Sequence, residues 1–175
     1  MTDWKFCPQC ATELALLVAE EDTGPVERLR CPACGFTHWN NPVPVLAAIV
    51  EYRGQVLLAR NAAWPAKMFA LITGFMEAGE TPQEGITREL KEETNLDAIA
   101  LDLVGVYDFQ RMNQVIIAFH VVAEGEVRLS PELLDWRLYD LPDLKCWPAG
   151  TGHALADWLR GRGFEPRFMD WAQRP

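Results

Sequence analysis

Acidic residues recur at helical spacing in one short segment of the sequence, from residue 74 to residue 96. Glu89, Glu92 and Glu93 stand as i, i+3 and i+4, so a helix would carry all three on one face. Like charges that share a face repel one another unless a cation compensates them. Hard divalent ions prefer oxygen ligands, which carboxylates supply. The spacing therefore predicts a site for a divalent cation.

The residues around these glutamates predict where the helix begins and ends. Thr81 followed by Glu84 forms a capping-box pattern, and Pro82 suits the first helical position. Gly74, upstream, predicts a sharp turn that leads into the helix. Asn95 falls where the helix should end, and Asn tolerates the left-handed conformation that terminates many helices.

The same segment resembles the Nudix box, a motif of the form G-x5-E-x7-R-E-U-x-E-E-x-G-U in which U is aliphatic. The matching positions are Gly74, Glu80, Arg88, Glu89, Leu90, Glu92, Glu93 and Leu96. Asn95 stands where the motif has its second glycine. The resemblance implies an α/β/α sandwich with a mixed sheet, and an enzyme that hydrolyses pyrophosphate bonds with Mg²⁺ or Mn²⁺.

The resemblance also implies a role for each charged residue of the box. Glu89, Glu92 and Glu93 would bind the catalytic Mg²⁺ or Mn²⁺. Glu80 would contribute at the rim of the site, while Arg88 would orient Glu89 or Glu80 rather than touch the substrate.

One more glutamate comes from a second resemblance. Residues 132–139 resemble the family's E-x5-W-F segment, with Leu138 in place of the usual tryptophan. In several relatives that glutamate joins the metal site or acts as general base, so Glu132 is a candidate; the alternative is a surface glutamate before a strand. The sequence does not choose between Glu89 and Glu132 as the base. Aromatic residues that could stack on a nucleobase, each with a core role as its plainer interpretation, are Phe69, Phe75, Tyr107, Phe109 and Trp136.

Four of the five cysteines form two C-x2-C pairs. Cys7 with Cys10, and Cys31 with Cys34, have the spacing of a tetrahedral zinc site whose four thiolates leave no open position. Two disulfides, a redox pair or four unrelated thiols are the alternatives. We expect structural zinc in a small ribbon that could not fold without it. His38 could replace a ligand, but a structural histidine is the simpler interpretation.

A zinc ribbon ahead of a Nudix domain resembles the NADH pyrophosphatase branch and ribbon-bearing enzymes that act on FAD or ADP-ribose. That branch carries the marker S-Q-P-W-P-F-P-x-S after the box, which residues 107–114 lack. The resemblance implies hydrolysis of a diphosphate of the ADP-ribose, FAD or NAD(H) class to two monophosphates. Competing hypotheses are a ligand-sensing or nucleic-acid-binding module, and removal of an NAD cap from RNA.

The elements that must position these residues suggest an α/β domain over residues 43–160, preceded by the ribbon at 1–38 and followed by a tail at 161–175. Expected strands are 43–52, 55–60, 68–73, 101–109, 114–123 and 135–141, with a short extended segment at 127–129 and a second helix at 151–160. The tail carries Phe164, Phe168 and Trp171, which we expect to pack on the domain or on a second subunit.

Bulk composition limits the partners. The chain has 175 residues, a hydrophobic fraction of 49% and a formal net charge of −9. That charge makes binding to a nucleic-acid backbone unlikely, because such binding needs a basic surface. No apolar run is long enough for a membrane span, and the N-terminus lacks a signal-peptide pattern. We expect a cytoplasmic protein, with a small nucleotide-diphosphate substrate and a homodimer as one option.

Overall fold

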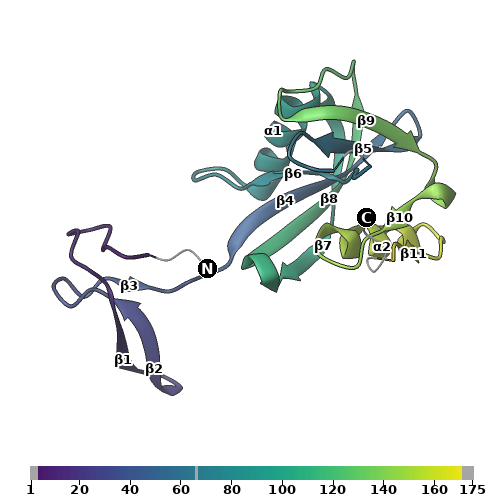
Figure 1. Cartoon of the computed structure of the whole chain (residues 1–175). Helices are drawn as coiled ribbons and strands as arrows, with labels where there is room; N and C mark the ends of the chain where they lie inside the picture. Colours follow the sequence, from purple (N-terminus) through teal and green to yellow (C-terminus); the bar gives the residue numbers. More distant parts are fainter. Residues whose placement is uncertain (1–3, 66, 171–175) are drawn as a thin grey trace. The chain divides into compact units, whose positions relative to one another are not determined.

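The computed structural model describes residues 4–65 and 67–170. The chain divides into two compact units, one ending at Asn41 and the other beginning at Pro42 (Figure 1). Within the described residues, neither helix has the length and apolar character that crossing a bilayer requires.

The first unit is a three-stranded antiparallel sheet of β1 (Ala15–Glu21), β2 (Gly24–Arg30) and β3 (Thr37–His38), in the order β1-β2-β3. Among its described residues, the buried core consists of Cys7, Leu14 and Cys31, with the partly buried Leu29 and Phe36 packed against them. Leu16 and Val18 of β1 are 63% and 67% exposed. The apolar side chains of β1 therefore add little to a core that depends on the thiols.

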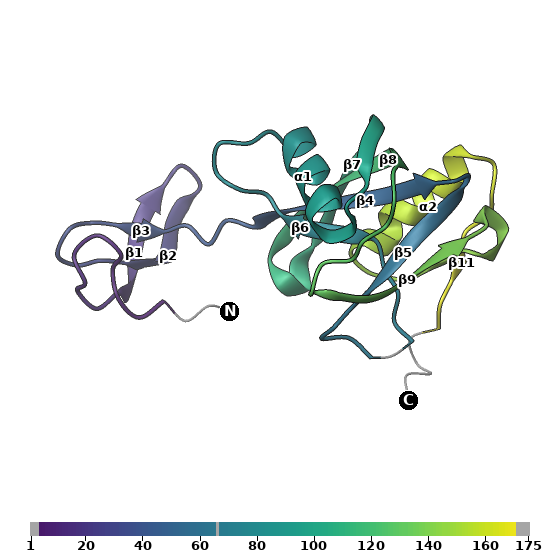
Figure 2. The ribbon, with the colours of Figure 1, turned by 90° about the horizontal axis from the view of Figure 1, so that it is seen from above.

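The second unit is built on a mixed sheet whose order is β7-β8-β4-β5-β9, with β6 pairing to β4 (Figure 2). Strand β4 runs parallel to β8, and every other pairing is antiparallel. Its strands are β4 (Val43–Tyr52), β5 (Gln55–Asn61), β6 (Ile72–Phe75), β7 (Asp97–Phe109), β8 (Gln114–Glu124) and β9 (Leu133–Tyr139). A 3-10 turn, η1 (Gln110–Met112), joins β7 to β8. A second, η2 (Leu141–Asp143), and the short parallel pair β10 (Lys145–Cys146) and β11 (Arg167–Phe168) lie beyond β9.

The two helices cover opposite faces of this sheet. Alternate residues of β4 point to opposite sides, so Leu46 and Ala48 pack with Ile86 of α1 (Pro82–Thr94). Ile49 packs on the other side against Leu155 of α2 (Thr151–Gly161). The mixed sheet between helices confirms the predicted α/β/α sandwich and its ribbon.

The segments expected at 68–73 and 127–129 differ from the structure. The strand expected at 68–73 instead spans Ile72–Phe75, so Gly74 lies inside a strand rather than in a turn. Residues 127–129 form no strand, because the Arg128 backbone N–H donates to the carbonyl of Thr94 at the end of α1. In the tail, Phe164 packs on the core around α2, as expected. Phe168 lies in β11, where its backbone pairs with Cys146 of β10. Trp171 lies outside the described residues.

Candidate active site

Helix α1 begins and ends as its sequence predicts. The Thr81 hydroxyl accepts the Glu84 N–H at 3.2 Å, and the Glu84 carboxylate accepts the Thr81 N–H at 2.8 Å, which completes the capping box. Asn95 ends the helix at a φ of 63°, in the left-handed region. Its side-chain amide also donates to the Glu126 carbonyl at 3.0 Å. The helix carrying the glutamates is therefore fixed at both ends.

Gly74 lets β6 approach the helix closely. A side chain on Gly74 would collide with the carboxyl group of Glu89. The glycine is thus needed for space beside Glu89 and not for a turn. Gly85 has a similar role that we did not predict, because a Cβ there would press on Glu80 and on Leu46. A glycine inside a helical pattern was the available signal.

Arg88 is the centre of the box's ion-pair network. Its guanidinium donates to Glu80 at 3.0 and 2.9 Å, to Glu89 at 2.8 Å and to Glu92 at 3.1 Å. It also donates to the Phe75 carbonyl of β6 at 3.2 Å. These hydrogen bonds lower the pKa of Glu80 and raise that of Arg88, so both groups stay charged. Arg88 therefore fixes three carboxylates at once.

Glu93 lies outside this network and is half-buried. Burial, followed by the charges of Glu89, Glu132 and Glu92, raises the pKa of Glu93 to about 7. Negative charge at this point is therefore undercompensated by the protein itself. A divalent cation would supply the missing positive charge. The acidic side chains around Glu93 offer it carboxylate oxygens, which are the ligand atoms that hard cations prefer.

Backbone hydrogen bonds hold the segment that carries Glu132 beside helix α1. The Ser130 N–H donates to the Glu93 carbonyl at 3.0 Å, and the Ala62 N–H donates to the Glu132 carbonyl at 2.8 Å. These bonds join the segment before β9 to both α1 and β5. Glu132, distant in sequence, is exposed and close enough to influence the ionisation of Glu93.

The structure separates the aromatic candidates. Phe69 and Trp136 pack in the core, with Arg137 over the Phe69 ring at 4.4 Å. Tyr107 and Phe109 contribute to the core on the α2 side of the sheet, away from the glutamates. Phe75 is 59% exposed, and its backbone carbonyl accepts a hydrogen bond from Arg88. Of the five aromatic candidates, Phe75 alone is both exposed and adjacent to the box.

The four cysteines of the ribbon form one compact cluster. Their sulfur atoms all lie within 4.8 Å of one another, with separations of 3.5 Å for Cys7–Cys34 and 3.4 Å for Cys10–Cys31. Four thiolates around zinc, at bond lengths of about 2.3 Å, would stand about 3.8 Å apart. The cluster fits that ion. His38 is not part of it, because its ring stacks on Trp4 at 5.1 Å.

Two family models match the chain. One described as NUDIX domain matches residues 40–159, and one described as Nudix N-terminal matches residues 5–40. The chain is also similar to a NUDIX hydrolase of Nitrosomonas europaea of known crystal structure, with 29% identity and a TM-score of 0.73. That match covers 95% of this chain and 97% of the other.

Curated relatives carry the name NAD-capped RNA hydrolase NudC. The protein of Stutzerimonas stutzeri (strain A1501) is 25% identical over 147 residues, which are 83% of this chain and 51% of the relative. The protein of Vibrio atlanticus (strain LGP32) is 29% identical over 153 residues, 84% of this chain and 54% of the relative. The chain thus spans about half the length of the curated relatives it matches.

Proposed function

This chain belongs to the Nudix family, and we propose that it hydrolyses the diphosphate of a nucleotide of the NAD(H), FAD or ADP-ribose class to two monophosphates. The carboxylate cluster of α1 carries the proposal. Arg88 holds Glu80, Glu89 and Glu92 in one network, and Glu93 stands beside Glu132. Gly74 in β6 leaves space for the Glu89 carboxyl group, which a larger residue would displace. A helix whose glutamates were only surface residues would not need a glycine at that position.

Mg²⁺ or Mn²⁺ is the proposed catalytic ion, with Glu89, Glu92 and Glu93 as its ligands and Glu80 at the rim. When bound, such a cation would offset the charge of the diphosphate and make water a stronger nucleophile near neutral pH. Zinc is the proposed structural ion of the ribbon, held by Cys7, Cys10, Cys31 and Cys34.

The protein's own residues would position the reaction. Arg88 restrains Glu89 so that its carboxylate, only 14% exposed, keeps one orientation. A restrained carboxylate suits cation binding better than proton transfer to and from a moving water. Glu132 is exposed, and the structure gives its carboxylate no ion-pair partner among the described residues. We therefore favour Glu132 over Glu89 as the general base.

The names of the curated relatives support the NAD class and favour a second candidate, NAD-capped RNA. Both substrates present the same diphosphate to the glutamates. They differ in the polyanionic strand that follows the adenosine in RNA, which a chain of net charge −9 would repel at low salt. The dinucleotide is therefore the first substrate we propose.

A product assay with Mg²⁺ tests both candidates. NAD, NADH, FAD, ADP-ribose, an NAD-capped oligonucleotide and ATP are compared as kcat/KM. We expect cleavage of the dinucleotides and ADP-ribose to AMP and a second monophosphate, with triphosphates poorer because they lack the binding energy of a second substrate half. Glu93→Gln is the control variant with strongly reduced activity. Triphosphate hydrolysis without dinucleotide cleavage would reject the substrate class.

The assay also ranks the capped RNA. If the capped oligonucleotide exceeds free NAD in kcat/KM at physiological salt, the second candidate replaces the first. The chemistry proposed for the glutamates stands in either case, because Glu93→Gln should slow both reactions by about 100-fold.

A further inference from the structure

The segment between β8 and β9, residues 125–132, has no helix or strand of its own. Its first residues are bonded to neighbouring elements. The Tyr52 hydroxyl donates to the Gly125 carbonyl at 2.8 Å, and the Asn95 side-chain amide donates to the Glu126 carbonyl at 3.0 Å. The path of the segment beside the C-terminal end of α1 is therefore fixed where it begins.

Ser130 connects this segment both to α1 and to Glu132. Its backbone N–H donates to the Glu93 carbonyl at 3.0 Å, and its side-chain Oγ accepts the N–H of Glu132 at 3.3 Å. Its carbonyl accepts the N–H of Leu133 at 3.1 Å. A serine hydroxyl that accepts the N–H two residues further on stabilises a turn. One residue thus binds the helix at Glu93 and holds the turn that presents Glu132.

Every backbone N–H from residue 130 to residue 133 has an acceptor at this turn. Pro131 has no N–H, and the other three N–H groups bind the Glu93 carbonyl, the Ser130 Oγ and the Ser130 carbonyl. The Glu132 carbonyl in turn accepts the Ala62 N–H at 2.8 Å. Both backbone polar groups of Glu132 are therefore bonded, and the Ser130 hydroxyl is the side-chain partner in that set.

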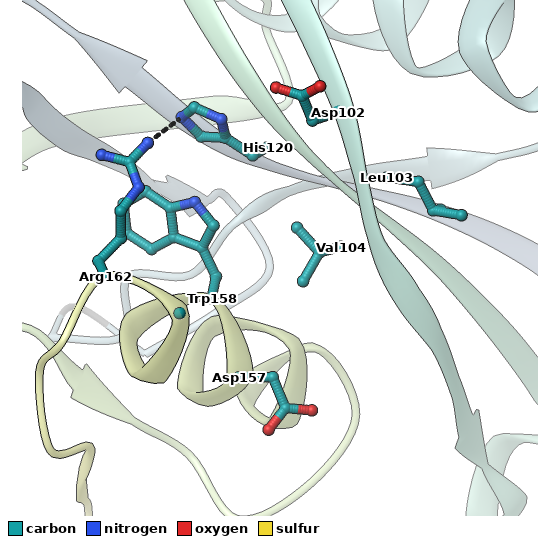
Figure 3. Close-up of a pocket in the computed structure, with 8 residues that line it drawn as sticks. Asp102, Leu103, Val104, His120, Asp157, Trp158 and Arg162 are labelled. Atoms are coloured by element: carbon teal, nitrogen blue, oxygen red, sulfur yellow. Dashed lines mark hydrogen bonds between the residues drawn. The ribbon is translucent and has the colours of Figure 1, made fainter.

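The side chain of Glu132 has no comparable restraint. Among residues 4–65 and 67–170, no group donates a hydrogen bond to its carboxylate or forms an ion pair with it. Asp157, which lines the cavity beside α2 (Figure 3), shows the contrast. Its carboxylate accepts Arg160 Nη1 at 2.7 Å and the Tyr107 hydroxyl at 3.1 Å. The position of Glu132 therefore depends on the bonds to its backbone.

We propose that Ser130 is a positioning residue: its hydroxyl sets the place of Glu132, and its N–H keeps Glu132 beside the helix that carries Glu93. This role rests on the proposed function, in which Glu132 acts as the general base. A base must lie within hydrogen-bond reach of the water that it deprotonates, so a small displacement slows the reaction. Loss of the hydroxyl should therefore act on turnover, while the glutamates that bind the cation stay in place.

Steady-state kinetics at saturating Mg²⁺ test the proposal on whichever of NAD, NADH, FAD and ADP-ribose has the highest kcat/KM. Ser130→Ala should lower kcat about tenfold, with KM changed less than about twofold. Ser130→Thr keeps a hydroxyl on the same carbon and should retain at least about half of the wild-type kcat. Thr87→Ala is the matched control, because it removes a hydroxyl that donates to the Gln83 carbonyl within α1 at 2.8 Å. It should leave kcat unchanged, and thermal unfolding checks that each variant is folded.

A double-mutant cycle with Glu132→Gln separates positioning from a general loosening of the turn. If Ser130 acts through Glu132, Ser130→Ala should cost less than about twofold in kcat once Glu132→Gln is present. Equal losses in the two backgrounds would overturn the positioning role and leave the proposed function intact. So would a wild-type kcat for Ser130→Ala beside a slowed Glu132→Gln.

Two further outcomes reach beyond Ser130. A wild-type kcat for Glu132→Gln would reject Glu132 as the base and the positioning role with it. Absence of cleavage by the wild-type chain with all four substrates would reject the proposed function itself.

Discussion

At the residue scale, the site holds charge that the protein does not neutralise. The raised pKa of Glu93, about 7, means that its ionised form is disfavoured in the folded chain. An acid of this kind destabilises the fold above its folded pKa, and the penalty vanishes below the ordinary value of 4.5. Ionised Glu93 thus lowers the free energy of unfolding when no cation is bound. Such a cost is expected of a side chain whose role is to bind a cation.

Glu93→Gln should therefore raise stability while it removes activity. Without added divalent ions we expect a gain of roughly 1 kcal/mol at about pH 8.5, allowing for solvent screening, and none at about pH 4.5. Turnover at saturating Mg²⁺ should fall about 100-fold, or about 3 kcal/mol of transition-state stabilisation. Thermal unfolding at the two pH values and steady-state kinetics check both effects. Near wild-type turnover would remove Glu93 from the mechanism.

Gly74→Ala tests the space reserved for Glu89. The added methyl would displace the end of the Glu89 side chain and no backbone atom, so we expect little change in melting temperature but a loss of at least about tenfold in kcat. Gly161→Ala is the matched control, since a Cβ there meets nothing within 4 Å. If both variants keep full activity, the position of Glu89 is not critical.

At the element scale, the end of α1 joins the helix to the chain segment that brings Glu132. Asn95 has two functions there, since its backbone adopts the left-handed conformation and its side chain reaches the Glu126 carbonyl. The Arg128 and Ser130 N–H groups bind carbonyls of the same helix end. The helix terminus thus positions a second segment as well as ending the first.

Substitutions at Asn95 separate these functions. Asn95→Gly should stay within about 0.5 kcal/mol of the wild type, because better backbone freedom offsets the lost exposed hydrogen bond. Asn95→Ala loses both and should cost about 1 kcal/mol or more. Urea denaturation measures the two differences. A larger loss in the glycine variant than in the alanine variant would contradict the left-handed cap as the main constraint.

At the scale of the whole molecule, the two units depend on different kinds of core. The second unit buries residues on both faces of its sheet, whereas the first relies on Cys7, Leu14 and Cys31. So small a core cannot offset the entropy lost on folding without a further constraint. Zinc is the constraint that the clustered thiols fit.

The purified protein should therefore contain one zinc ion per chain. Cys31→Ala should unfold the first unit while the second retains a cooperative thermal transition. Metal analysis and calorimetry of the full chain measure both. Absence of zinc, combined with disulfides in a non-reducing peptide map, would exclude this account.

The sequence by itself determined the local features. The capping box, the left-handed Asn95, the helical face of glutamates and the C-x2-C pairs each depend on residues a few positions apart, so their geometry follows from backbone chemistry. The mixed sheet was also predictable, because long apolar runs alternating with two helices leave few arrangements.

Only the tertiary structure decided which distant residues meet. Gly74 was expected to form a turn, but it proved to be a strand residue facing Glu89, because strand pairing with Leu46 sets its place. The approach of Glu132 to Glu93 depends on backbone bonds between separate elements, which no local pattern encodes. The contact of His120 with Glu51 likewise joins two strands far apart in sequence. Such contacts arise from packing, in which each residue's neighbours are set by the whole fold.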